Sequence, residues 1–368
     1  MRHASRIPST IEPNELSEIV AEKERNQEYF LNLTISQFDA DYDPNPQGML
    51  TARETIARYW RPNVGVDPRR LFLTSSTSEA YSALLRTFCD PQDEILVPQP
   101  SYPLLTHLVE VEGCRPVAYA LREAEGWFVD LEDLRQKITP KTKMLWIVHP
   151  NNPTGSYLGL EQMREIVALA KEHSLAVVSD EVFFEYPLEN ESHASFLDFP
   201  ANDVPVFVLG GLSKLLGLPQ KKLSWIALHA NNGLAGHVEE KLLWVLDLYL
   251  SVNAQVQEDC EALFQTFSSR SKDIRTRIRE NHATLLSMLK VDRRCRYVLN
   301  QGGWNAILRL ESGTDAALFC KRLLLERNVY AYPGDWFDLP FSGVVVSLLA
   351  EPDIFREGLQ TLLDQASG

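Results

Sequence analysis

Short apolar segments alternate with longer segments of helical periodicity through the middle of the chain. The apolar segments have the composition of buried strands, and between several of them apolar residues recur at the spacing of a helix. This alternation predicts an α/β fold with a mostly parallel sheet covered on both faces, a three-layer αβα arrangement. The predicted strands are residues 71–73, 94–97, 116–121, 144–148, 176–179, 206–209 and 223–228, and the helices between them are residues 79–89, 104–111 and 161–173.

Outside this block the chain predicts a second, smaller domain. A largely helical stretch leads into a C-terminal part that mixes strand-like and helix-like segments. These segments are residues 232–289, 304–310, 315–327, 344–349 and 353–363. The N-terminal helix predicted over residues 15–32 lies outside the α/β block and is expected to complete the smaller unit. We therefore expect a large cofactor-binding domain of residues 43–265 and a small α+β domain formed by residues 1–42 and 266–368.

The composition excludes several classes of protein. The formal net charge of −14 over 368 residues argues against binding to nucleic acid, which needs a basic face. The five cysteines form no CxxC pair, so we expect reduced thiols in a cytoplasmic protein and neither a disulfide framework nor a metal site. No stretch approaches the roughly 20 apolar residues of a membrane span, and the N-terminus lacks the apolar region of a signal peptide.

Lys214 differs from an ordinary surface lysine in its sequence surroundings. It follows the apolar run 204–209 and lies among glycines and leucines in residues 211–219. In an apolar pocket desolvation disfavours the ammonium form, which leaves a nucleophilic amine able to condense with an aldehyde. The obvious biological aldehyde is pyridoxal 5'-phosphate. That cofactor also needs a phosphate site, a partner for its pyridine nitrogen, a donor for its phenolic oxygen and a flat surface for its ring.

Two of these needs are met by residues that follow predicted strands. Ser76, Thr77 and Ser78 lie between a strand and a helix start, an arrangement that directs free backbone amides and hydroxyls at a phosphate. The alternative for this run is a plain serine-rich N-cap. Asp180 ends the strand 176–179, where ligands of α/β sheets bind, and its carboxylate would keep the pyridine nitrogen protonated. The alternative for Asp180 is an N-cap or a surface loop acid.

The other two needs are met after the strands 144–148 and 94–97. Asn152 lies in a loop stiffened by two prolines and a glycine, and its amide could donate to the phenolic oxygen; a tight turn is the alternative. Tyr102 is braced by three prolines and could stack on the ring; a core-capping aromatic is the alternative. Each pattern is weak by itself, and their joint occurrence after strands favours the cofactor.

The chain resembles the class I/II aminotransferases of pyridoxal-phosphate fold type I from about residue 42 to residue 363. The resemblance is carried by the hydroxyl run 76–78, Tyr102, Asn-Asn-Pro-Thr-Gly at 151–155, Ser-Asp-Glu at 179–181 and Ser213-Lys214.

The resemblance implies a role for each of these residues. Lys214 would form the internal aldimine and then move a proton between the substrate Cα and the cofactor C4′. Asp180 would pair with the pyridinium, Asn152 would donate to the phenolic oxygen, and Tyr102 would stack on the ring. The hydroxyl run and Ser213 would also contact the cofactor. Tyr42 would reach the phosphate in the neighbouring subunit, which implies a homodimer with shared active sites.

Four positions depart from the family pattern. Lys222 stands where the family usually has a phosphate-binding arginine, and lysine keeps the charge but loses the bidentate fork. Gly211 stands where a further phosphate-binding serine often lies. Phe183 replaces a tyrosine that donates to the phenolic oxygen, so a higher pKa of the lysine-bound cofactor is expected. Val345 stands near the usual position of the arginine that binds the substrate carboxylate.

The missing arginine predicts either another cation or an unusual amino donor. Arg309, Arg2 and Arg6 are candidate cations, and a surface charge is the alternative for each. Aromatic side chains of the C-terminal part could line the substrate pocket, with core packing as the alternative. These are Trp304, Tyr332 and Trp336.

Together, these observations predict a pyridoxal-phosphate-dependent aminotransferase of amino-acid metabolism. It would move an amino group from an amino acid or amine to a 2-oxo acid or other carbonyl. A lyase, decarboxylase or cyclase of the same fold type is the alternative, because the sequence does not show which Cα bond lies perpendicular to the ring. A cofactor-binding regulatory protein would need an added DNA-binding domain, for which this acidic chain has no spare length.

Overall fold

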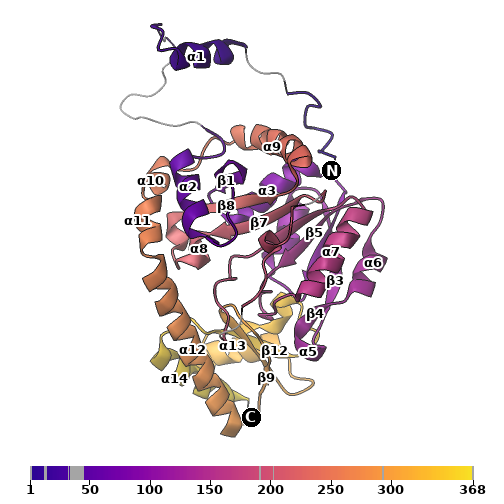
Figure 1. The fold of residues 1–368 in the computed structure, drawn as a ribbon. Helices are drawn as coiled ribbons and strands as arrows, with labels where there is room; N and C mark the ends of the chain where they lie inside the picture. The colour runs from indigo at the N-terminus through magenta and orange to yellow at the C-terminus, as the bar shows by residue number, and fades with distance from the viewer. Residues whose placement is uncertain are drawn as a thin grey trace.

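An eight-stranded sheet forms the centre of the larger part of the molecule (Figure 1). The computed structural model describes residues 2–11, 15–31, 33, 45–189, 192–201, 203–291 and 294–366. The strand order across the sheet is β1-β8-β7-β6-β5-β2-β3-β4. The strands are β1 (Leu71–Thr74), β2 (Glu94–Gln99), β3 (Arg115–Arg122), β4 (Phe128–Val129), β5 (Thr142–Val148), β6 (Ala176–Asp180), β7 (Val206–Gly211) and β8 (Ser224–His229).

The direction of the strands brings several strand ends to one edge of the sheet. β7, β6, β5, β2 and β3 are parallel neighbours in that order, whereas β8 is antiparallel to both β7 and β1, and β4 is antiparallel to β3. The sheet is therefore mixed, with the predicted parallel pairing in its middle. Because β8 reverses direction between β1 and β7, the carboxyl ends of β1, β7, β6, β5 and β2 share one edge with the beginning of β8.

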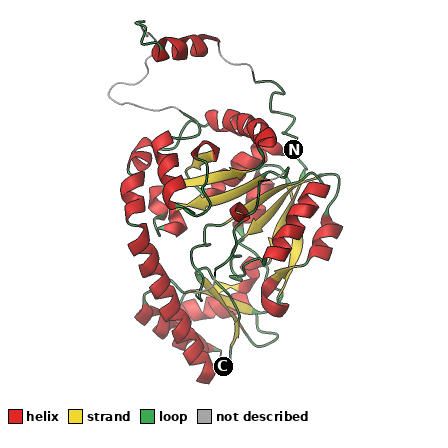
Figure 2. Cartoon of the chain, in the orientation of Figure 1, coloured by secondary structure: helices red, strands yellow, loops and turns green. Residues whose placement is uncertain are grey.

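Helices cover both faces of this sheet, which confirms the predicted three-layer αβα fold (Figure 2). On one face α3 (Thr77–Phe88), α4 (Leu104–Val111) and α9 (Asn232–Asp247) pack against alternate strand residues that include Phe72 and Phe207. On the other face α2 (Leu50–Tyr59) and α7 (Leu160–Glu172) pack against residues that include Leu71 and Val208. Successive side chains of a strand point to opposite faces, which separates the two clusters. Shorter helices complete the layers: α5 (Ala124–Trp127), α6 (Leu131–Lys137), α8 (Leu212–Leu215), α10 (Ala254–Glu258) and α11 (Cys260–Gln265).

A second, antiparallel sheet lies in the smaller C-terminal part, which the sequence predicts to mix strands and helices. Its strand order is β11-β12-β10-β9. The strands are β9 (Arg296–Val298), β10 (Asn305–Arg309), β11 (Tyr332–Pro333) and β12 (Gly343–Ser347), and the helices packed with them are α12 (Phe267–Val291), α13 (Ala316–Arg327) and α14 (Pro352–Gln365). The long α12 runs from α11 beside the large sheet to the small sheet (Figure 1). Within the described part of the chain, no helix is both long enough and apolar enough to cross a membrane.

The N-terminal segment differs from the expectation that it completes the small domain. Ala4 and Ile7 are buried against Val245 of α9, on the large sheet's side of the molecule. The amine of the buried Lys241 donates to the carbonyl oxygens of residues 8 and 9 at 3.1 and 3.0 Å, which fastens the segment there. α1 (Glu15–Arg25) lies at the end of the molecule away from the small sheet (Figure 1). The domain boundaries inferred from the sequence stay a prediction.

Candidate active site

Five residues singled out by the sequence follow five different strands whose carboxyl ends share one edge of the large sheet. Thr77 follows β1, Tyr102 follows β2, Asn152 follows β5, Asp180 ends β6, and Lys214 follows β7 in the short helix α8. The carboxyl edge of parallel strands is where α/β folds bind their ligands. The fold therefore brings the separately predicted residues to one region of the molecule.

Lys214 has an apolar and aromatic environment. Its Nζ lies 5.2 Å from the ring centroid of Phe183 and 5.1 Å from that of Trp304. Burial lowers the pKa of Lys214 below its ordinary value, and the nearby carboxylate of Asp180 opposes this shift. The hydroxyl of Tyr186 donates to the carbonyl oxygens of Lys214 and Leu215, at 3.1 and 2.7 Å. These two bonds hold α8 against the segment that follows β6.

Asp180 is a buried carboxylate, only 7% exposed. Its Oδ2 accepts a hydrogen bond from the hydroxyl of Tyr81 at 2.8 Å, and its Oδ1 accepts one from the backbone N–H of Val182 at 3.1 Å. Burial raises the pKa of Asp180, while these hydrogen bonds and the charge of Lys214 oppose the rise. An ionised carboxylate can accept more than two hydrogen bonds, so Asp180 retains capacity for a further donor. The surface-acid alternative is excluded by this burial.

Tyr81 was missed by the sequence analysis. It lies on α3 four residues after Thr77, so both side chains occupy the same face of the helix. Its ring centroid is 4.4 Å from that of Trp146 on β5, which holds the phenol under the sheet edge. The sequence did offer one indication: Tyr81 comes one helical turn after the hydroxyl run, on the helix that this run begins.

Asn152 is held in place by the small sheet. The side-chain amide of Asn305, the first residue of β10, donates to the Oδ1 of Asn152 at 2.6 Å. Because the oxygen is engaged, the Nδ2 of Asn152 is the end of the side chain left to donate. The loop itself docks on the small domain through Gly155, whose carbonyl accepts from the backbone N–H of Gly302 at 2.9 Å. A Cβ at Gly155 would lie 2.4 Å from the Gly302 carbonyl oxygen, so this approach requires glycine.

Tyr102 follows β2 at the same edge of the sheet, where the charge of Asp180 acts on it. Burial and the charge of Asp180 both raise its pKa, and the residue is 36% exposed. Its neighbour Ser101 donates a backbone hydrogen bond to the carbonyl of Phe337 at 3.1 Å. This bond anchors the backbone next to Tyr102, while the Tyr102 side chain itself stays partly exposed.

One residue of the hydroxyl run 76–78 caps a helix, which was the alternative to phosphate binding for this run. The Ser76 hydroxyl accepts from the backbone N–H of Glu79 at 3.1 Å and caps α3, while Thr77 and Ser78 begin the helix. The first backbone amides of a helix have no partner within the helix, so those of Thr77 and Ser78 can serve an anion. Ser213 is half-buried in α8. Lys222 is exposed, with φ of 53°, at the end of the short 3-10 helix Pro219–Lys221.

Two predicted cofactor contacts, Phe183 and Tyr42, and two predicted substrate-pocket residues, Tyr332 and Trp336, remain to be placed. Phe183 is buried and packs edge-on against Trp304 at 5.4 Å between ring centroids. Tyr42 lies outside the described residues. Tyr332 and Trp336 are exposed and adjacent, with ring centroids 5.6 Å apart.

No cation stands at the position where the family arginine was expected. Val345 is 1% exposed in β12, between Ile307 of β10 and Tyr332 of β11. Arg309 forms an ion pair with Glu123, and its guanidinium lies 3.7 Å from the ring centroid of Phe341.

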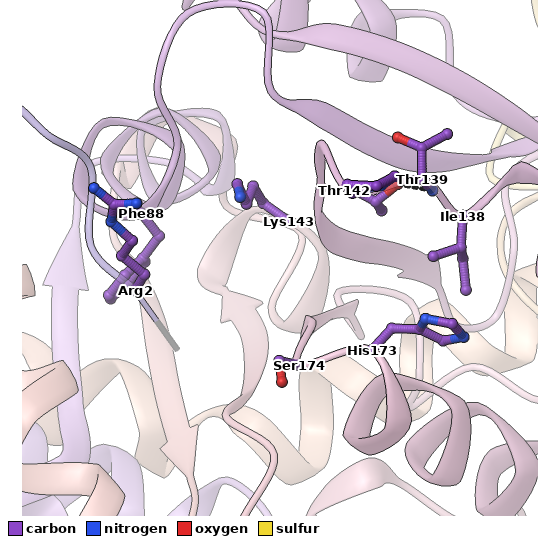
Figure 3. A pocket seen from close by; sticks show the side chains of 9 residues that line it. Arg2, Phe88, Ile138, Thr139, Thr142, Lys143, His173 and Ser174 are labelled. Carbon is purple, nitrogen blue, oxygen red and sulfur yellow. Dashed lines mark hydrogen bonds between the residues drawn. The ribbon is translucent and has the colours of Figure 1, made fainter.

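Arg2 and Arg6 lie at the other end of α3 from Thr77. A guanidinium nitrogen of Arg6 donates to the carbonyl of Leu85 at 3.4 Å. Arg2 lines a surface pocket with Phe88 and Lys143 (Figure 3). Because a twelve-residue helix is about 18 Å long, neither arginine is near the lysine edge within one chain. The pocket of Figure 3 includes the start of β5 and so belongs to the opposite edge of the sheet.

A buried ion pair stabilises the segment after Asp180. A guanidinium nitrogen of Arg61 lies 3.0 Å from Oε2 of Glu181, and its guanidinium lies 3.6 Å from the ring centroid of Phe184. Hydroxyls of Ser179 and Ser195 also donate to the Glu181 carboxylate. Arg61 has no local sequence signal for this contact, which joins residues 120 positions apart.

A family model described as aminotransferase class I and II matches residues 20–347 of the chain. Over 230 residues, the chain is 30% identical to the glutamate-pyruvate aminotransferase of Escherichia coli (strain K12), covering 62% of this chain and 56% of that protein. It is 26% identical over 321 residues to a tyrosine aminotransferase of Dictyostelium discoideum, covering 84% of this chain and 76% of that one. The chain thus spans about half the length of the first of these relatives.

Solved structures share the whole fold. The structure of an alanine aminotransferase from Pyrococcus furiosus superposes with a TM-score of 0.82 at 25% identity, over 98% of this chain and 89% of the other. The structure of an aspartate aminotransferase from Thermotoga maritima gives a TM-score of 0.79 at 21% identity, over 96% of each chain. The second likeness concerns the fold alone.

Proposed function

The chain belongs to the class I and II aminotransferase family, and we propose that it is an enzyme that binds pyridoxal 5'-phosphate through Lys214. It would move an amino group from an amino acid or amine to a 2-oxo acid or another carbonyl compound. The cofactor supplies an aldehyde, a ring that withdraws electrons when its nitrogen is protonated, and a phosphate for anchoring.

The observation that carries this proposal is a desolvated amine near a buried carboxylate. The lowered pKa of Lys214 makes its neutral amine available at lower pH than that of a surface lysine, which suits attack on an aldehyde. The carboxylate of Asp180 accepts two hydrogen bonds, and no ion pair of Asp180 is found within the described part of the chain. A cationic ring nitrogen would supply the charge that a buried carboxylate needs. Both groups therefore fit this cofactor.

In this proposal each residue would serve a named part of the cofactor. Lys214 would hold the aldehyde carbon, and its amine would be available to carry a proton at the substrate Cα. Asp180, oriented by Tyr81, would keep the pyridine nitrogen protonated. Asn152 would donate to the phenolic oxygen, and Tyr102 would cover one face of the ring.

The phosphate would be bound at the beginning of α3. The free backbone amides of Thr77 and Ser78 support this assignment, because a helix N-terminus attracts a dianion. Hydroxyls and a positive charge would add to it. These are supplied by Ser76, Thr77, Ser78, Ser213 and Lys222, and by Tyr42 of a neighbouring subunit in a homodimer with shared sites.

The substrates in this proposal are an amino donor and a carbonyl acceptor of the amino-acid and 2-oxo-acid type that the family uses. The relatives described above are a glutamate-pyruvate aminotransferase and a tyrosine aminotransferase, and one of the similar structures is an alanine aminotransferase. The buried Val345 leaves β12 without a cation for a substrate carboxylate. We therefore expect a donor whose carboxylate is absent, or is bound by amides or another cation. A cytoplasmic location is part of the same proposal.

The same feature favours a second candidate function. Without the arginine, the substrate could bind with a different Cα bond perpendicular to the ring. The alternative is therefore a lyase, decarboxylase or cyclase that uses the same cofactor on an amino acid.

A half-reaction screen tests the proposal. Purified protein loaded with pyridoxal 5'-phosphate is mixed with single amino acids and amines while its visible absorbance is followed. An aminotransferase converts the cofactor to its amine form and releases the carbonyl compound that corresponds to the donor. Release of carbon dioxide or ammonia without accumulation of the amine form would support the alternative, and an unchanged spectrum with every donor would contradict both.

Lysine variants provide the matched comparison for this screen. Lys214→Ala should abolish the conversion. Lys221→Ala removes a nearby lysine that is paired with Asp259 at 3.3 Å, and it should leave the conversion unchanged.

A further inference from the structure

Ser224 lies between the two strands that lead to the proposed phosphate site and to Lys214. It is the first residue of β8 and pairs with Thr74, the last residue of β1, and with Gly211, the last residue of β7. β1 continues into α3, and β7 continues into α8 with Lys214. Ser224 therefore stands at the carboxyl edge of the sheet, midway between the beginnings of these two helices.

The side chain of Ser224 points to the face of the sheet that α3 covers. Ile226 and Leu228, which follow Ser224 at intervals of two residues, belong to the apolar cluster packed under α3. Residues two apart on a strand share a face, so the Ser224 side chain has the same direction. Directly opposed residues in an antiparallel pair also share a face, which places the missing side chain of Gly211 there too.

Ser224 and Gly211 compete for one volume. A Cβ at Gly211 would lie 2.3 Å from Oγ of Ser224 and 3.1 Å from its Cβ. The hydroxyl of Ser224 therefore occupies the space in which a side chain at residue 211 would begin. A serine at residue 224 in this position therefore requires a glycine at residue 211.

Among the residues that the structure describes, none forms a hydrogen bond with the hydroxyl of Ser224. Ser224 is 2% exposed. The neighbouring Thr74 hydroxyl, in contrast, donates to the carbonyl of Ser76 at 3.0 Å. The Ser224 oxygen is not among the fully enclosed unpaired atoms of the described residues, so it meets the small accessible surface that Ser224 retains, where a ligand can reach it. A ligand at the beginning of α3 would provide its hydrogen-bond partner.

We propose that Ser224 binds the phosphate group of the cofactor and supplies, from β8, the hydroxyl that β7 lacks at Gly211. The ligand recognised is a phosphate monoester dianion, which accepts hydrogen bonds from the hydroxyl of Ser224 and from the free backbone amides of Thr77 and Ser78. This assignment depends on the proposed function, and it adds to that function a phosphate contact from Ser224 of β8, which is not among the site residues predicted from the sequence.

Two forms of the vitamer separate phosphate binding from lysine chemistry. Pyridoxal has the same aldehyde as pyridoxal 5'-phosphate but no phosphate. In Ser224→Ala, we expect the affinity for pyridoxal 5'-phosphate to fall about ten- to a hundredfold, as for loss of a hydrogen bond to a charged group. Pyridoxal has no phosphate for residue 224 to contact, in the wild type or in the variant. The variant's affinity for pyridoxal should therefore stay within about twofold of the wild-type affinity. Equal affinities of the variant and the wild type for the phosphate form, or equal losses for both forms, would overturn the proposal.

An exchange of the two residues gives an independent test. Gly211→Ser alone should lower the thermal unfolding temperature, because its Cβ would meet Oγ of Ser224. The double variant Gly211→Ser/Ser224→Gly keeps one hydroxyl in the shared volume and removes the clash. It should recover most of the unfolding temperature and at least half of the lost binding energy for pyridoxal 5'-phosphate. A folded double variant that binds the cofactor as weakly as Ser224→Ala would contradict the shared role.

The outcome for the wild type distinguishes failure of this inference from failure of the proposed function. If neither vitamer stays on the wild-type protein after the unbound vitamer is removed, the proposed function fails. If both stay bound and Ser224→Ala behaves like the wild type, only the role of Ser224 fails.

Discussion

The hydroxyl of Tyr81 donates a 2.8 Å hydrogen bond to the carboxylate of Asp180, linking α3 to the end of β6. This contact connects the helix at whose beginning we propose the phosphate site with the carboxylate that we propose for the pyridine nitrogen. The Tyr81 hydroxyl therefore fixes the position of Asp180 relative to the beginning of α3.

Replacing Tyr81 with phenylalanine should weaken the cofactor site. The bond from Tyr81 to Asp180 is present without the cofactor, so its loss acts on binding through the orientation of Asp180, and we expect cofactor affinity to fall by up to about tenfold. The measurement is a titration with pyridoxal 5'-phosphate followed by absorbance. Tyr119→Phe is the control, because Tyr119 is also buried but donates to the carbonyl of Trp146 at 2.9 Å. Equal effects of the two substitutions on affinity would show that Tyr81 has no special role.

Replacing Asp180 with asparagine should change the pH dependence of cofactor capture. Burial lowers the pKa of Lys214, and the charge of Asp180 partly restores it. The reactive amine is the deprotonated form, so capture accelerates as pH rises through this pKa. Asp180→Asn removes the raising influence, and the midpoint of the rate profile should move to lower pH. Asp259→Asn, next to Lys221, should not move it; a midpoint that rises in Asp180→Asn would contradict the assignment.

Replacing Phe183 with tyrosine should alter the bound cofactor. The Phe183 ring centroid lies 5.2 Å from the Lys214 amine, so a phenol there could reach the cofactor's phenolic oxygen. A donor to that oxygen stabilises its anionic form, and the pKa of the bound chromophore should fall. Absorbance titration between acidic and alkaline pH measures this midpoint. An unmoved or higher midpoint would refute the prediction, and Phe184→Tyr, beside Arg61, serves as the comparison.

Replacing Arg61 with methionine should strongly destabilise the protein. The substitution leaves Glu181 buried without its cation, and breaking a buried pair typically costs about 3–5 kcal/mol. Urea unfolding measures the free energy. Arg58→Met breaks an exposed pair with Glu261 and should cost about 1 kcal/mol or less. The double variant Arg61→Met/Glu181→Gln should lose less than Arg61→Met; a larger loss would argue against an uncompensated charge as the cause.

Much of the candidate site could be predicted because its parts follow strands in the sequence. Asp180, Asn152 and Lys214 each come after an apolar run that is recognisable locally. The carboxyl ends of parallel strands meet at one edge, so the local pattern carries three-dimensional information. The three-layer fold is predictable for the same reason, since it depends on periodicity along the chain.

The contacts that support these residues join distant segments and have no local pattern. Tyr81 meets Asp180 across 99 positions, and Asn305 meets Asn152 across 153. The composition of β8 indicates a buried strand but not its direction, and only the antiparallel direction brings Ser224 opposite Gly211. The contact of Ala4 and Ile7 with Val245 of α9 could not be predicted, because two apolar residues are too few to indicate which surface they cover.

The central claim is that Lys214 binds pyridoxal 5'-phosphate covalently. The most direct measurement is borohydride reduction of the protein incubated with the cofactor, followed by proteolysis and mass spectrometry of the peptides. The account predicts one pyridoxyl group on Lys214 in the wild type and in Lys221→Ala, and none in Lys214→Ala. A wild-type protein without the modification, or a Lys214→Ala protein that retains it at the same level, would contradict the account.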